Sequence, residues 1–454
     1  MLIRHVFIAL LLVAILQSLA EAQAVASQAS TATPVQDASI PTLQGGSLAF
    51  EPELARTNYL NTGISIGTAF DDNALSTSSD RISNFGYSVL PYIGLKQSRG
   101  RLNWTLDYAA GLTINQQLSS RNQGSHNLGF ESEYWLSPHV NFLVRDRFLM
   151  TTGFFDQVNQ NHDGTSGTVL QTPNQAVLTP LAKQTSNTAT TQITYQFGRD
   201  SQIGGSGTFY QSHYNDAPVN TTLIDTNSQE AEAFYNHRLF DRDSIGVTYR
   251  FQRLTFSPVF NNVLTHSVLA TYTFRPRSNL SLSVFAGPQY TNNNSELMVL
   301  TMQLPVIYLS AIPISQKSWS PAVGGSFNWN GQRTSFVADA SRMINDGGGL
   351  LGAVKLTTFD AAVRRQLSRN YTTELGVVYG LSDTVGSSAL SYSSVKSATG
   401  NFSLSRRFGT DFGLTLGYAY AYQLQTNSAP GSTNINHNRA WITISYTFSR
   451  PLGR

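Results

Sequence analysis

From about residue 57 onward, the chain repeats one unit, in which about ten or slightly more residues alternate between apolar and polar before a turn. Eighteen such stretches can be counted, although sixteen would also fit the pattern. In the last stretch, Ile442, Ile444, Tyr446 and Phe448 share one parity, and mostly hydroxyl side chains share the other. Alternation of period two indicates strands that separate an apolar surface from a polar one.

The connections between these stretches alternate in length. Tight turns such as "SRGR", "GRDS" and "GTD" follow the even-numbered stretches, and longer polar loops follow the odd-numbered ones. Asn330 and Gly331 form a strong hairpin signal. A soluble sandwich would not confine its long loops to every second connection. The pattern therefore predicts an all-β fold, a transmembrane antiparallel up-and-down β-barrel of about 18 strands.

The composition favours the same class of protein. Only 13% of the residues are charged and 11% are aromatic, and the formal net charge is +3. A soluble domain normally carries about twice that charged fraction. The small net charge gives no support to nucleic-acid binding.

The amino terminus predicts export. Residues 1–22 combine Arg4, a short apolar run and small residues near Ala22, as a cleavable signal peptide does. The alternative, a membrane anchor, would need about 20 apolar residues. Residues 23–56 read as a flexible periplasmic leader and 57–454 as the barrel. Because the chain has no cysteine, we expect the outer membrane of a Gram-negative bacterium rather than eukaryotic secretion.

The two ends of the barrel should meet. We expect the last strand to pair with the first, around "NTGISIGTAF", because bilayers leave no strand edge unpaired. A final strand ending in an aromatic residue resembles the signal read by the barrel-assembly machinery, although "SRPLGR" follows Phe448 here. The stretch "SIGTAFDDNAL" resembles the first strand of β-barrel porins of bacterial envelopes, some of which are associated with exopolysaccharide. That resemblance implies a barrel and, more weakly, a link to polysaccharide.

Charges inside the strands should face the lumen, because a lipid-facing arginine near the midplane costs about 2 to 4 kcal/mol. We expect cross-strand pairs of Glu133 with Arg145, Glu131 with Arg147, Glu232 with Arg250, and Glu374 with Arg364. These cross-strand charge pairs could only stiffen the wall of the barrel, or they could also line an aqueous passage. Asp146 falls on the outward parity. The predicted pore-lining residues are Glu131, Glu133, Arg145, Arg147, Glu232, Arg250, Arg364 and Glu374.

Two long connections stand apart. The loop containing Asp156, His162 and Asp163 is long enough to fold into the lumen as a constriction. The apolar segment 297–314 predicts an extended hairpin or an internal plug, with an exposed partner-binding patch as the alternative, since its prolines disfavour a helix.

No residue pattern predicts catalysis or a cofactor. The eight histidines lack metal-ligand spacing, and Ser267 points away from His266. Asp71 and Asp72 are weak calcium candidates at the outer end of the first strand.

We therefore expect a porin-like channel for passive passage of small hydrophilic solutes. The alternatives are a barrel that serves exopolysaccharide export or attachment, which inward-facing Trp135 and Trp441 would suit, and a barrel enzyme. The expected partners are outer-membrane lipid and lipopolysaccharide, the assembly machinery, and a solute or polysaccharide. The oligomeric state stays open.

Overall fold

The structure is a computed structural model that describes residues 58–119, 122–151, 177–178, 182–215, 223–258, 261–303, 306–385, 392–427 and 432–452. All of these residues belong to one compact unit, Val35–Arg454. The strands are β1 (Tyr59–Asp71), β2 (Asn84–Arg99), β3 (Leu102–Asn115), β4 (Gln123–Ser137), β5 (Val140–Thr151), β6 (Lys183–Gln196), β7 (Ser201–Asn215), β8 (Asp225–Phe240), β9 (Asp243–Ser257), β10 (Asn261–Arg277), β11 (Leu280–Gln303), β12 (Val306–Asn330), β13 (Thr334–Gly347), β14 (Leu351–Gln366), β15 (Tyr371–Thr384), β16 (Tyr392–Phe408), β17 (Phe412–Asn427) and β18 (Ser432–Pro451).

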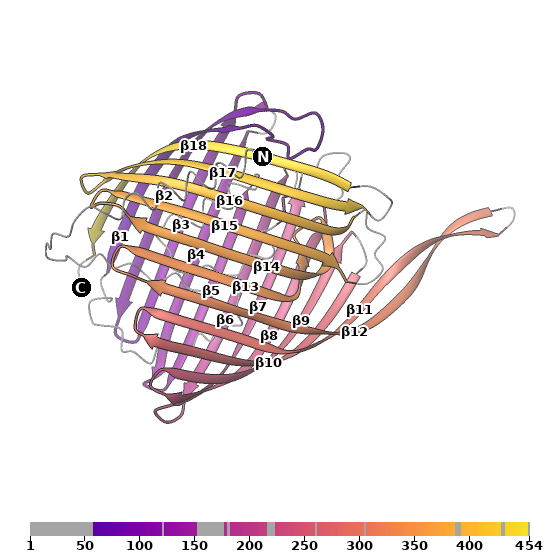
Figure 1. Ribbon diagram of the computed structural model, residues 1–454, viewed down its shortest axis with the longest axis horizontal. Coiled ribbons are helices and arrows are strands. Elements are labelled where there is room, and N and C mark those ends of the chain that lie inside the picture. The colour runs from indigo at the N-terminus through magenta and orange to yellow at the C-terminus, as the bar shows by residue number, and fades with distance from the viewer. Residues whose placement is uncertain are drawn as a thin grey trace. The chain divides into compact units, whose positions relative to one another are not determined.

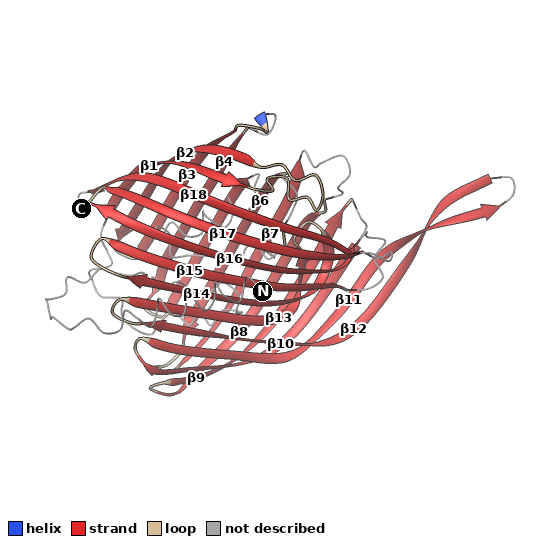
Figure 2. Cartoon of the chain, turned by 45° about the horizontal axis from the view of Figure 1, so that its top comes forward, coloured by secondary structure: helices blue, strands red, loops and turns tan. Residues whose placement is uncertain are grey.

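The strands form a closed 18-stranded antiparallel barrel (Figures 1 and 2). Each strand pairs with the next in sequence, and β1 pairs with β18 to complete the ring. The predicted fold class and strand count are confirmed. In the described residues, no helix is long and apolar enough to cross a membrane.

The seam between the first and last strands lies where the sequence places it. Thr62 is opposite Phe448, and the register continues to Asp71 opposite Arg439. At the long-loop end, the carboxylate of Asp72 accepts hydrogen bonds from the backbone N–H and the side-chain amide of Asn438. These contacts leave no unpaired edge between β1 and β18.

The β11–β12 hairpin extends beyond its neighbours, as Figure 1 shows. β10 pairs with β11 only as far as Ser295, and β13 pairs with β12 only from Val323 downward. β11 and β12 stay paired with each other up to Gln303 and Val306. The apolar segment 297–314 therefore belongs to an extended hairpin, which is one of the forms predicted for it. Its backbone is a two-stranded antiparallel ribbon.

Candidate functional site

The outer surface of the barrel is apolar and aromatic. Along the seam, Ile64, Ile66, Ile444 and Tyr446 share the outward parity, and Ile444 is 57% exposed. The same parity carries exposed large apolar side chains on strands around the ring, among them Phe85, Leu106, Ile193, Val247, Val284, Leu375 and Leu416. A continuous ring of exposed apolar side chains on a closed sheet needs lipid around it. The chain is a transmembrane β-barrel.

The candidate site is the lumen, and its first charged group lies on β4 and β5. Glu131 is opposite Arg145, with the carboxylate 2.9 Å from the guanidinium Nε. Glu133 lies opposite Leu143 and instead accepts hydrogen bonds from Asn103 and Asn141. The expected pairs Glu133 with Arg145 and Glu131 with Arg147 are therefore wrong by two residues.

One residue of this difference arises near the turn between β4 and β5. The register of this strand pair shifts between Trp135 and Ser137, so β4 carries an extra residue before the chain reverses. Arg147 consequently lies opposite Gly129, on the same row as Asp107 of β3. Glycine leaves open space in this row, since a Cβ built at Gly129 would meet nothing within 4 Å. The inward placement of Glu131, Glu133, Arg145 and Arg147 agrees with the prediction.

The second charged group joins β8 and β9. Glu232 lies opposite Arg250 as expected, with 3.8 Å between its carboxylate and the guanidinium Nε. Glu230, which the sequence analysis did not single out, accepts a hydrogen bond from the same guanidinium. A third contact runs from Arg250 Nη1 to the sulfur of Met343, 3.4 Å away. Arg250 thus links two carboxylates of the wall to β13.

The third charged group lies on β13, β14 and β15. Arg364 is opposite Glu374, as predicted. Asp339 and Asp360 are opposite each other on the inward parity, and neither was predicted. Their parity could have been read from the sequence, since each alternates with apolar outward neighbours. Together with Asp107, they add three carboxylates to the inner wall beyond those predicted.

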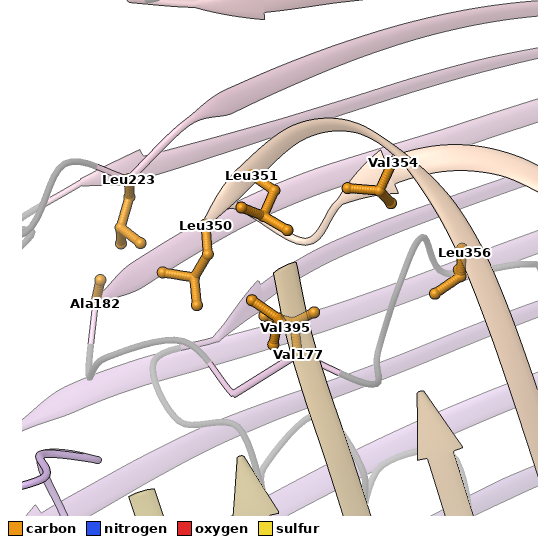
Figure 3. Close-up of a cluster of buried hydrophobic side chains, with 8 residues drawn as sticks. All are labelled: Val177, Ala182, Leu223, Leu350, Leu351, Val354, Leu356 and Val395. Carbon is orange, nitrogen blue, oxygen red and sulfur yellow. The ribbon is translucent and has the colours of Figure 1, made fainter. Parts of the chain in front are cut away.

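Above these charges, an apolar hairpin enters the lumen. We call residues 343–356, which include the end of β13 and the start of β14, the plug hairpin. β13 leaves β12 after Arg342, so the backbone is free to bend inward there. Leu351 and Val354 are fully buried against Leu223 and Val395 (Figure 3). Ile344 and Ala353 pack instead against inward side chains of β9 and β10, namely Leu254, Phe256 and Val263.

These contacts fix where the plug hairpin lies. Leu254 and Val263 belong to β9 and β10, whereas Val395 belongs to β16, well separated from them around the ring. Because β13 and β14 lie between these strands in the ring, a segment of theirs that touches both sets of inward side chains must lie inside the barrel. Water-sized gaps are rare in such close-packed apolar clusters. The plug hairpin therefore closes at least part of the passage at the long-loop end.

Hydrogen bonds tie the plug hairpin to the wall. Gln289 Oε1 accepts from the backbone N–H of Ile344 at 3.2 Å. The tip is held by Tyr214, whose hydroxyl donates to the carbonyl of Gly348, and by Ile224, whose N–H donates to the carbonyl of Gly349. Gly349 has a φ of +85°, and a Cβ there would lie 2.5 Å from the Tyr214 ring. Only glycine fits this close approach to the wall.

A second segment reaches the lumen wall from the long loop after β5. Leu178 is fully buried with Ala419, Ala421 and Ile435. Its N–H and C=O both bond to the side chain of Gln423, at 2.6 and 3.0 Å. The constriction candidates Asp156, His162 and Asp163 lie outside the described residues, and their role stays a prediction; of the same loop, Val177 and Leu178 are described and are buried.

The calcium candidates have other partners. Asp71 pairs with His437 and accepts a hydrogen bond from the backbone of Asn73. Asp72 binds Asn438 across the seam. Within the described ranges there is no group of three His, Cys, Asp or Glu side chains that could hold a metal ion.

Comparisons with known proteins add the following. No family model and no curated protein matches the chain. Among solved structures, it is similar to OpdQ of Pseudomonas aeruginosa, with 10% identity and a TM-score of 0.41 over 86% of this chain and 99% of that one. It is also similar to OccAB4 of Acinetobacter baumannii, with 9% identity and a TM-score of 0.43 over 87% and 98%. The ferric-catecholate import receptor Fiu of E. coli K12 gives 8% identity and 0.42 over 85% and 81%.

Proposed function

We propose that the protein is a porin-like channel of a Gram-negative outer membrane, which passes small hydrophilic solutes through a charge-lined lumen and is closed by the plug hairpin. A ring of 18 strands encloses a lumen wide enough for water and small solutes. Charged side chains on the inner wall suit an aqueous passage, because they would otherwise be buried at a high cost.

The observation that carries the proposal is the contrast between the two levels of the lumen. The middle of the wall holds charges such as Glu131, Arg145 and Asp107, whereas the long-loop end is filled by Leu351, Val354 and their neighbours. Charged groups in the middle of the inner wall suit a water-filled lumen at that level. This arrangement supports a water-filled passage that the plug hairpin closes at the long-loop end.

The test compares the conductance of the native protein with that of a variant that lacks the plug hairpin. In one variant, residues 345–353 are replaced by a short glycine linker, and heat modifiability on gels confirms a folded barrel. We expect low conductance from the native chain in planar bilayers and steady, larger conductance from the variant. A folded variant that conducts no better than the native chain would rule out the channel.

The exopolysaccharide alternative would be favoured by a ladder of aromatic rings inside the lumen. Trp441 does face inward, where it packs over Gly417. The cross-strand ring pairs recorded in the described residues, such as Phe70 with Phe85, lie on the outward parity instead. This arrangement gives the polymer role no added support.

A further inference from the structure

The outer face of β9–β12 changes in chemistry, row by row, toward the long-loop end. Each row takes one outward residue from each of the four strands, as fixed by their pairing. Four of these rows, in order, are Val247, Ala270, Ala286 and Val323; then Phe251, His266, Tyr290 and Trp319; then Arg253, Leu264, Asn292 and Lys317; then Thr255, Asn262, Asn294 and Ser315. Between the first two lie Tyr249 and Val268 on β9 and β10, and Pro288 and Pro321 on β11 and β12. The face therefore passes from aliphatic to aromatic to basic to polar.

The aromatic row is continuous. The ring of His266 lies 5.2 Å from that of Phe251 and 6.5 Å from that of Tyr290, and Tyr290 lies 5.1 Å from Trp319. Trp319 is 72% exposed. Aromatic rings with a polar edge collect at the boundary between hydrocarbon and headgroups. The row therefore marks that boundary on this face.

The basic row begins one step beyond the boundary. Arg253 and Lys317 are both exposed, and no ion pair recorded in the described part of the chain involves either of them. Three strand spacings separate them, about 14 Å. Between them lies Asn292, which accepts a hydrogen bond from Ser315 through its Oδ1 and keeps its amide N–H₂ available as a donor. The row presents two cations and an amide at headgroup depth.

We infer that this face, built from Arg253, Asn292, Lys317 and Trp319, binds the phosphorylated headgroup of a glycolipid in the outer leaflet. The inference rests on the proposed membrane location. Guanidinium and ammonium groups are the side chains that recognise phosphate. The exposed Trp319 ring offers the flat apolar surface on which a sugar ring packs. A protein partner would leave the two cations without an anion unless it carried a matching acidic face.

The test uses the full chain in detergent and native mass spectrometry. The probe is lipid A with both phosphates on its diglucosamine headgroup, compared with the same lipid after dephosphorylation and with inorganic phosphate alone. We expect a retained adduct with the phosphorylated lipid only. Arg253→Gln combined with Lys317→Gln should weaken it at least tenfold, and higher salt should weaken it further.

The matched control removes equal charge from other outward positions. Lys396→Gln with Arg365→Gln changes two exposed basic residues on β16 and β14, and should leave the adduct unchanged. Equal loss in both double variants would show a general charge effect and overturn the site. Equal binding of the dephosphorylated lipid, or full binding by the Arg253 and Lys317 variant, would overturn it as well. Conductance in bilayers is measured separately, so a failed channel proposal would not be mistaken for a failed lipid site.

Discussion

The plug hairpin can be loosened without disturbing the barrel wall, and Leu351→Ala is the sharpest way to do so. Leu351 has no exposed surface and packs within the cluster that joins the plug hairpin to Leu223 and Val395. Truncating a fully buried leucine to alanine costs about 2 to 5 kcal/mol. That cost falls on the plugged state, because a displaced hairpin would already have lost these contacts.

The expected magnitude follows from this difference. Each 1.4 kcal/mol changes an equilibrium constant about tenfold, so the ratio of unplugged to plugged barrels should rise by about thirty-fold to a few thousand-fold. Single-channel recordings in planar bilayers would measure it as a rise in open probability. The conductance of each opening should stay the same, since the lining charges are untouched.

A control on the same strand separates this effect from general destabilisation. Phe359 lies on the outward parity of β14 and is 46% exposed. Phe359→Ala removes a larger side chain but does not touch the plug hairpin, so open probability should not change. If Leu351→Ala gave a folded, heat-modifiable barrel with native open probability, the hairpin would not be the closure.

Three further predictions follow from the contacts. Arg145→Gln should shift reversal potentials toward cation selectivity and Glu131→Gln toward anion selectivity, and both shifts should shrink between 0.1 and 1 M salt, where the Debye length falls from about 10 to about 3 Å. Gln423→Leu leaves the buried backbone of Leu178 without both hydrogen bonds, at a cost of about 1 to 3 kcal/mol, and should raise open probability. Cysteine at Gln316 should react with a membrane-impermeant label in whole cells, whereas cysteine at Arg369 in a short turn should not; the reverse pattern would invert the topology.

The wall of the barrel was predictable because its signals are local. Period-two alternation decides the facing of each side chain, and the tight turns decide where each hairpin reverses. Glu232 with Arg250 and Glu374 with Arg364 follow from these two signals alone. In the β4–β5 hairpin the expected pairing differs from the observed one by two residues, and the extra residue near Trp135, which no feature of "WLSPH" predicts, accounts for one of them.

The plug hairpin was not predicted, for a different reason. Length singled out the loop after β5, whereas the plug hairpin has a turn of only a few residues between β13 and β14. No prediction was made for its sequence, "NDGGGLLG". What carries it into the lumen is the loss of pairing between β12 and β13 beyond Val323, and that is a long-range property of the sheet.

A sequence signal for the plug hairpin nevertheless exists on β9. An inward face that meets only water should stay polar along its whole length, as Thr190, Gln192 and Thr194 do on β6. On β9 the same parity changes from Thr248 and Arg250 to Leu254 and Phe256 toward the long-loop end.

Since the outward face of β9 is apolar lower down, a run of apolar residues on the inward parity requires a second apolar surface inside the barrel. On the neighbouring strand β10, Val263 is buried on the inward parity opposite Leu254. Where the inward parity of a strand becomes apolar at one end, the lumen at that level is filled by protein, and the segment that fills it must be apolar and flexible enough to turn inward. "GGGLLG" meets both conditions, with glycines for the turn and leucines for the contact.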